Sequence, residues 1–218
     1  GLYRAVLSIR LQPGDSIPLN FNYSYRERGF SNGNPQTFLV NNGSFFNNKE
    51  VFPTIGYNEN FELSDKDKRK KYGLPERKRM ALITDTTMWN NTYLGNDGNW
   101  IHFKAVVSTA HDQVALAPGR LVKQWTVNNR NYYSYQVDGK MLNFYSFLSA
   151  DYQVKRENYK GVELEVYYHR GHEFNVPNML KAMKRSLDYY QANFSPFQHK
   201  NLRIVEFPRY ATFAQSFP

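Results

Sequence analysis

Histidine side chains are the first candidates for metal or acid-base chemistry in this chain of 218 residues. Only His169 and His172 lie close together, in the order His-Arg-Gly-His-Glu. A zinc-peptidase helix needs His-Glu-x-x-His instead, because both imidazoles must lie one turn apart on one face, beside a glutamate. Gly171 also separates the pair, just before a predicted helix. The residue order therefore favours a corner between a strand and a helix over a metal site.

Sequence signals for other catalytic chemistry are weak. The chain contains no cysteine, so thiolate nucleophiles, disulfides and thiolate metal sites are excluded. It has no Gly-x-x-x-x-Gly-Lys phosphate loop and no Gly-x-Gly-x-x-Gly fingerprint. Taken residue by residue, the chain favours a binding or scaffolding role over an active site.

The formal net charge of +9 comes mostly from one segment. Its eight basic residues are Lys66, Lys68, Arg69, Lys70, Lys71, Arg77, Lys78 and Arg79. A nucleic-acid interface would need such charge spread over a surface, with aromatic side chains for stacking. Acidic residues interrupt this run, and Gly73 and Pro75 break it. We therefore expect a solvated loop, and no nucleic acid as a partner.

Period-two alternation of apolar and polar residues dominates the first three-quarters of the chain and predicts short strands. The expected strands cover residues 7–11, 19–25, 38–40, 101–107, 121–125, 132–135, 141–147 and 162–168. Asp138-Gly139 is a hairpin signal between the strands at 132–135 and 141–147, and a long irregular stretch covers residues 41–99. Many short strands separated by turns, in a chain with 17 Tyr and 16 Phe, predict an antiparallel β-sandwich over residues 1–170.

After residue 170 the period changes to that of a helix. Apolar residues then recur at spacings of three and four up to Phe194, which predicts an amphipathic helix over about 176–194. Asn175 is in position to cap it and Pro177 suits its first turn. A strand is expected over 202–207. We interpret residues 171–218 as the beginning of a second, α/β domain.

Three stretches of this sequence resemble the aminopeptidase N-like zinc metallopeptidases. The segment 161–173, Gly-Val-Glu-Leu-Glu-Val-Tyr-Tyr-His-Arg-Gly-His-Glu, resembles the junction between the β-domain of that family and its catalytic domain. The helix that follows keeps Tyr190 and Phe194 near its end, as the family's first catalytic helix does. The segment 202–208 resembles the strand before the substrate-binding loop. The resemblance implies an N-terminal β-domain followed by the start of a peptidase domain.

Two further segments, residues 45–58 and 206–218, are similar to a bacterial subgroup in which the peptidase-like region is joined to a transporter permease. That likeness implies a parent protein anchored in a bacterial membrane, so a membrane would be a partner only through the parent. The chain begins at Gly1 without Met and ends at Pro218 directly after a strand pattern. We therefore expect a piece of a longer protein.

The resemblance also implies which positions would face a substrate. Family members have Gly-Ala-Met-Glu-Asn after the last strand, and its glutamate holds the free amino group of the peptide. The corresponding block here places Gln215 before Ser216, with Ser216 at the glutamate position. Ser44 stands where the family has Gln or Glu upstream. Since charge-assisted hydrogen bonds are roughly twice as strong as neutral ones, we expect weaker recognition of a free N-terminus.

The zinc ligands and general base of the family would lie beyond residue 218, so no cofactor is expected in this chain and zinc only in the parent. The first hypothesis is therefore a noncatalytic N-terminal piece that shields and lines the peptide-binding cleft, with the rest of the parent as its partner. An alternative hypothesis is a free-standing β-sandwich module whose Tyr and Trp side chains bind sugars or peptides.

Overall fold

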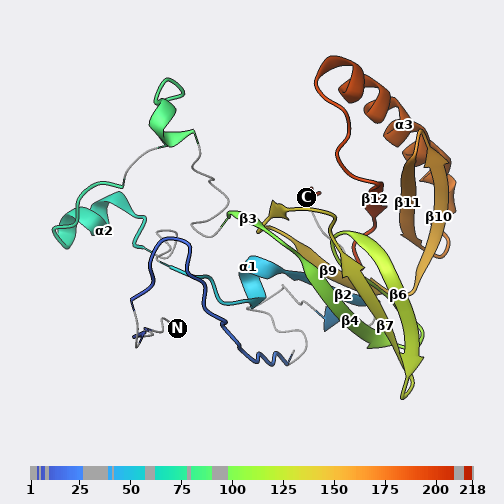
Figure 1. Ribbon diagram of the computed structural model, residues 1–218, viewed down its shortest axis with the longest axis horizontal. Coiled ribbons are helices and arrows are strands. Elements are labelled where there is room, and N and C mark those ends of the chain that lie inside the picture. The colour runs from blue at the N-terminus through green and yellow to red at the C-terminus, as the bar shows by residue number, and fades with distance from the viewer. Residues whose placement is uncertain are drawn as a thin grey trace.

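The computed structural model describes residues 4, 6–7, 10–26, 39–40, 42–56, 62–77, 80–89, 98–208 and 214–217. Strands make up most of its regular structure, and Figure 1 shows them gathered in one half of the picture. In the described part of the chain, no helix is both long enough and apolar enough to cross a bilayer. The predicted mainly β fold, with antiparallel sheets and a short segment of helix, is confirmed.

Two antiparallel sheets form the larger part of the molecule. The first has the strand order β1 (Leu39–Val40), β2 (Gly43–Asn47), β9 (Ser146–Ala150), β5 (Val114–Leu116). The second has the order β4 (Lys104–Ala110), β7 (Arg130–Gln136), β6 (Arg120–Val127). A short pair of β3 (Trp100–Ile101) and β8 (Met141–Leu142) lies beside them.

The two sheets share a core because alternate residues of each strand point to opposite faces. Tyr133 and Tyr135 of β7 point inward and are buried against Ala115 and Leu116 of β5. Each buried tyrosine also needs a partner for its hydroxyl group. Tyr135 Oη donates to the carbonyl of Ala115 at 2.9 Å, and Tyr133 Oη to that of Gln113 at 3.2 Å.

A third sheet contains the region where the sequence pattern changes from the period of strands to that of a helix. β10 (Tyr152–Tyr159) pairs with β11 (Val162–His169) in antiparallel register, and β12 (Asn201–Val205) pairs with β11 in parallel register. The helix α3 (Val176–Asn193) connects β11 to β12 and covers one face of this sheet (Figure 1). Its buried residues Val176, Leu180, Met183 and Leu187 form one stripe at helical spacing. The division into domains at residue 170 stays a prediction.

The start of α3 agrees with the sequence pattern, but its cap differs in detail. Asn175 occupies the capping position and Pro177 lies in the first turn. The Asn175 side chain caps no backbone N–H group of the helix. It accepts a hydrogen bond from the amide of Asn178 instead, at 3.3 Å.

Three expectations about strands are wrong. The single strand expected over 141–147 is instead two strands, β8 and β9, in different sheets. Residues 19–25 form no strand, although they alternate clearly. The expected hairpin at Asp138-Gly139 is also absent, because β7 pairs with β4 and β6, whereas β8 pairs with β3. Alternation shows which side chains share a face but not which strand supplies the backbone partner. Of the first expected strand, residues 8 and 9 lie outside the described residues.

The stretch 41–99 holds more regular structure than its sequence suggests. Besides β2 it contains the helices α1 (Asn48–Val51) and α2 (Lys66–Lys71) and the 3-10 helix η2 (Thr86–Met88). The basic run therefore begins as a helix rather than a loop. Its Arg69 is buried, with its guanidinium bonded to Glu62 and to the carbonyls of Leu63 and Pro75.

Candidate functional site

A groove of about 730 Å³ runs along β12 and is the candidate site of this chain. We call it the β12 groove. One wall comes from the first sheet and the residues just after β5, including Leu116, Ala117 and Leu148. The opposite wall is β12 itself, and residues 214–217 border one end.

The outer edge of β12 faces this groove. In the described part of the chain β12 pairs with β11 only. Along a parallel strand, the backbone N–H and C=O groups of successive residues point alternately toward the strand on one side and toward the opposite side. Lys200 accepts from Glu163 N and Glu206 N donates to Tyr167 O, so the even-numbered residues face β11. The N–H groups of Asn201, Arg203 and Val205 therefore point outward, where an extended segment can pair with them.

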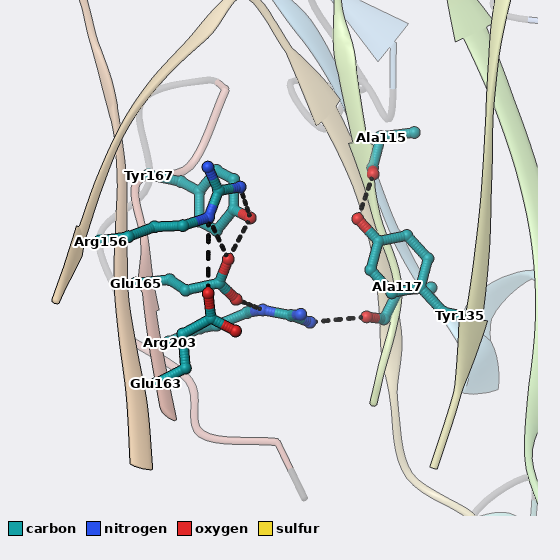
Figure 2. A network of polar contacts seen from close by, with 8 residues as sticks. All are labelled: Ala115, Ala117, Tyr135, Arg156, Glu163, Glu165, Tyr167 and Arg203. Atoms are coloured by element: carbon teal, nitrogen blue, oxygen red, sulfur yellow. Dashed lines mark hydrogen bonds and ion pairs between the residues drawn. The ribbon is translucent and has the colours of Figure 1, made fainter. Parts of the chain in front are cut away.

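A network of charged and phenolic side chains connects β12 to β10, to β11 and to the residues after β5 (Figure 2). Glu165 of β11 is almost fully buried and forms ion pairs with Arg203 of β12 and, at 2.9 Å, with Arg156 of β10. Tyr167 Oη donates to the same carboxylate at 2.8 Å. Arg203 Nη1 also donates to the carbonyl of Ala117 at 3.1 Å. This arginine thus links the two walls of the groove.

Opposing effects act on the pKa of Glu165, the central carboxylate of this network. Burial by itself would raise the pKa of Glu165, but the positive charge of Arg203 and the hydrogen bonds to the carboxylate leave that pKa below its ordinary value. Burial, followed by the charge of Glu165, raises the pKa of Tyr167 to about 12. Glu165 is therefore ionised and Tyr167 neutral at physiological pH, and each is hydrogen-bonded within the network.

One end of the groove is aromatic. The rings of Phe45 and Phe207 meet edge to face with centroids 5.0 Å apart. Phe217 lies 6.4 Å from Phe45 and 5.0 Å from Phe144. Such a cluster favours an apolar side chain of a ligand over a charged group.

The predicted cleft residues lie in two places. Gln215 and Ser216 both line the β12 groove. Ser44 instead lies within β2, where it pairs with Ser149 of β9, and it is not among the lining residues. The sequence did not single out Arg203 or the wall at Ala117. Only the alternation of β12, with Arg203 between apolar neighbours, hinted at a half-buried arginine.

The histidine pair lies at the corner between β11 and the start of α3, as the residue order predicts, and contacts the chain just after β12. His172 Nδ1 lies 2.6 Å from Glu206 Oε1, and the backbone N–H of His169 donates to the other carboxylate oxygen at 2.8 Å. His169 Nε2 lies 3.1 Å from the carbonyl of Phe207. Among the residues that the structure describes, no three His, Cys, Asp or Glu side chains gather as a metal site would require.

No protein-family model matches this chain, and no curated protein sequence matches it. Among solved structures, the M1 zinc metallopeptidase from Deinococcus radiodurans is similar in part. A mutant of it with the substrate Tyr-Ser-Ala bound gives a TM-score of 0.47 at 15% sequence identity, covering 53% of this chain and 28% of that one. The non-mutant form gives 0.46 at 14% identity with the same coverage. A mutant two-domain M1 zinc metallopeptidase with L-tryptophan bound gives 0.47 at 15%, again with that coverage.

Proposed function

We propose that this chain is the noncatalytic N-terminal region of an aminopeptidase N-like zinc metallopeptidase, and that the β12 groove lines part of its peptide-binding cleft. The main supporting observation is that Gln215 and Ser216, two of the three predicted cleft residues, border the same groove as the outer edge of β12, whereas Ser44 does not. An extended peptide would add to this edge through backbone hydrogen bonds. Its apolar side chains would contact the aromatic end of the groove.

The charges along the groove suggest what kind of peptide it would take. Arg203 is paired with Glu165, and Arg120 lies 3.3 Å from Asp138. Ser216 offers a hydroxyl where the family has a carboxylate. No described carboxylate without a partner lines the groove to meet an ammonium group. Recognition would therefore depend on the peptide backbone and apolar side chains more than on a free N-terminus.

The chemistry of hydrolysis would come from the rest of the parent. The described histidines and carboxylates do not fit a zinc ion, because His169, His172 and Glu206 are bonded to one another or to the backbone around β12. In this proposal the chain supplies a wall of the cleft, and zinc belongs to the partner region. A bacterial parent joined to a permease is part of the same proposal.

The test uses one backbone group of β12. Val205→Pro removes an N–H that points into the groove, whereas Ile204→Pro removes one that bonds to β11. A peptide Tyr-Ser-Ala with a C-terminal fluorophore, with a free or an acetylated amino group, is titrated and followed by anisotropy. We expect both forms to bind alike, and Val205→Pro to weaken binding about two- to tenfold, the worth of one hydrogen bond.

The control separates binding from stability. Val205→Pro should lower the unfolding temperature less than Ile204→Pro, because proline is tolerated on an edge strand whose N–H faces outward, although the Val205 side chain packs against the first core. Ile204→Pro should lower that temperature clearly. The proposal fails if the wild-type chain shows no saturable binding, or if acetylation of the peptide abolishes it.

A sugar-binding module is the alternative function. Trp125 on β6 is one candidate platform, but this ring stacks on Tyr132 at 5.4 Å and lies under Lys123 Nζ at 5.4 Å. The contacts leave less of the ring for a sugar. Binding of the isolated chain to a glycan array would favour this alternative over the peptidase proposal.

A further inference from the structure

The segment 80–89 presents large apolar side chains to solvent, far from the β12 groove in the sequence. Met80 is 70% exposed, Leu82 78%, Ile83 89% and Trp89 69%. We call these four residues the apolar tip. Figure 1 shows η2, which lies within this segment, standing apart from the sheets. A run of exposed apolar residues of this length is unusual on a protein surface and indicates a binding surface.

Local hydrogen bonds hold the apolar tip in shape. The indole Nε1 of Trp89 donates to the carbonyl of Ile83 at 3.0 Å. Asp85 caps η2, accepting from the backbone N–H of Thr87 at 3.1 Å and from its hydroxyl at 2.6 Å. The polar group of the indole is thus satisfied within the tip. Its ring and the three aliphatic side chains remain available for an apolar partner.

A set of lysines precedes the tip in the sequence, on α2. Arg69 is buried, and its bonds to Glu62, Leu63 and Pro75 hold α2 against the residues that flank it. The remaining basic residues of this helix, Lys66, Lys68, Lys70 and Lys71, face solvent. Of these four, only Lys66 forms an ion pair with a described residue, Glu76, at 3.2 Å. Positive charge and exposed Trp, Leu and Ile within one stretch of the chain are the combination that an anionic lipid surface attracts.

We propose that residues 62–77 and 80–89 dock on an anionic lipid surface. The apolar tip enters the boundary between headgroups and acyl chains, where the amphipathic ring of Trp89 is favoured. The lysines of α2 contact anionic headgroups. An apolar groove on a protein would bind the tip equally well but would make no use of the four lysines of α2. This inference is independent of the peptide groove.

The test measures co-sedimentation of the full chain with phosphatidylcholine vesicles, with and without about 30 mol% phosphatidylglycerol. We expect binding to the anionic vesicles at low ionic strength, loss of binding as salt is added, and little binding to phosphatidylcholine alone. Leu82→Ser with Ile83→Ser should weaken binding tenfold or more, since each aliphatic side chain contributes about 1.5–3 kcal/mol when fully buried.

Charge reversal tests the second half of the surface. Lys68→Glu with Lys70→Glu should weaken binding to anionic vesicles by at least about 25-fold, taking about fivefold for each lysine lost and further repulsion from the two added carboxylates. Val106→Ser is the matched control, because Val106 is an exposed apolar residue on β4, outside the proposed surface. It should bind like the wild type. All variants should keep the wild-type unfolding temperature, because the changed side chains are exposed.

Fluorescence reports on insertion. The emission of the wild-type chain should shift to the blue when anionic vesicles are added, and Trp89→Phe should remove the shift. The proposal is overturned if the wild type does not bind anionic vesicles at low salt, or if the tip and charge variants bind as well as the wild type. Dimerisation without lipid that Ile83→Ser abolishes would also overturn it, because it would assign the tip to a protein interface.

Discussion

Arg203 is the residue on which the candidate site depends most. It joins the carboxylate of Glu165 to the carbonyl of Ala117 and lies 5.4 Å from the centre of the Tyr135 ring. Burial removes water from the charges of Arg203 and Glu165, so each charge depends on its partner for stabilisation. The network therefore holds β12 in position as long as both partners are present.

Removing one partner of this buried pair should be costly. We expect Arg203→Leu to lower the free energy of unfolding by about 3 kcal/mol, the lower end of the range for breaking a buried pair, because Arg156 still contacts Glu165 at 2.9 Å. Urea unfolding measures the loss. Glu76→Gln, which breaks the exposed pair with Lys66, should cost less than about 1 kcal/mol. Equal losses for the two variants would contradict the role given to Arg203.

The buried tyrosines predict how stability changes in alkali. The pKa of Tyr167 is raised to about 12, and burial also raises the pKa values of Tyr135 and Tyr152. In the unfolded chain these groups ionise near the ordinary tyrosine pKa of about 10. The unfolded state therefore loses protons first, and stability should fall as pH rises from about 10 to 12.

Urea unfolding at several alkaline pH values measures this effect. Tyr167→Phe should reduce the slope of stability against pH in that window, since phenylalanine cannot ionise. A slope unchanged by the substitution would contradict the burial of the Tyr167 hydroxyl.

At the scale of elements, the sequence predicts best the parts whose periodicity matches their packing. The apolar stripe from Val176 to Leu187 predicts α3, since a single helix buries that stripe on β11. Strand β11 is also predicted closely. Residues 19–25 alternate just as clearly but have no strand partner among the described residues. Pairing depends on distant parts of the chain, so local pattern alone could not show this.

Hydrogen exchange tests that difference between elements. Amides of residues 19–25 should exchange at rates close to those of an unfolded peptide, because they form no described backbone ladder. Amides of β7, the central strand of its sheet, should be protected by the free energy of global unfolding. Strong protection of 19–25 in exchange measured by mass spectrometry would mean that these residues form a strand after all.

The start of β6 needs a glycine for two reasons. Gly119 has φ +86°, and a Cβ added there would lie 2.3 Å from the carbonyl oxygen of Gln136. Gly139 has a similar φ of +97° but no atom within 4 Å of such a Cβ. Gly139→Ala should therefore cost about 1–2 kcal/mol from backbone conformation alone. Gly119→Ala should cost more, by about 1–3 kcal/mol of steric strain.

Thermal or urea unfolding of the two alanine variants gives the comparison directly. Because both glycines share a left-handed conformation, their difference isolates the contact with Gln136. If both variants lose the same stability, that contact is not as close as the structure has it.

At the scale of the whole molecule, alternate residues of the third sheet belong to two different hydrophobic cores, one on each face of the sheet. Tyr152 belongs to the first core and donates to the carbonyl of Glu206, just beyond β12, at 2.7 Å. Val162, Leu164 and Val166 belong to the second core, under α3. The bonds of Arg203 and Tyr152 connect the cores, and the sequence could not predict these bonds because their partners lie far apart in the chain.

These connections predict a single unfolding transition. Leu180→Ala in the second core should cost about 2–5 kcal/mol and should shift helix and aromatic signals in circular dichroism by the same amount. Tyr189→Ala, at an exposed position of the same helix, should shift neither much. Two separate midpoints would show that the cores unfold independently.

The two walls of the β12 groove are contributed by distant parts of the chain, and Ala117 and Arg203 are 86 residues apart. During synthesis, the first wall is therefore complete long before the second leaves the ribosome. Until β12 has been synthesised, the side chains of Leu116 and Leu148 are exposed on the face that β12 later packs against. A nascent chain with such exposed apolar surface can be bound by chaperones. Slow translation between β11 and β12 would lengthen this interval, so the yield of folded protein should depend on codon usage in that stretch.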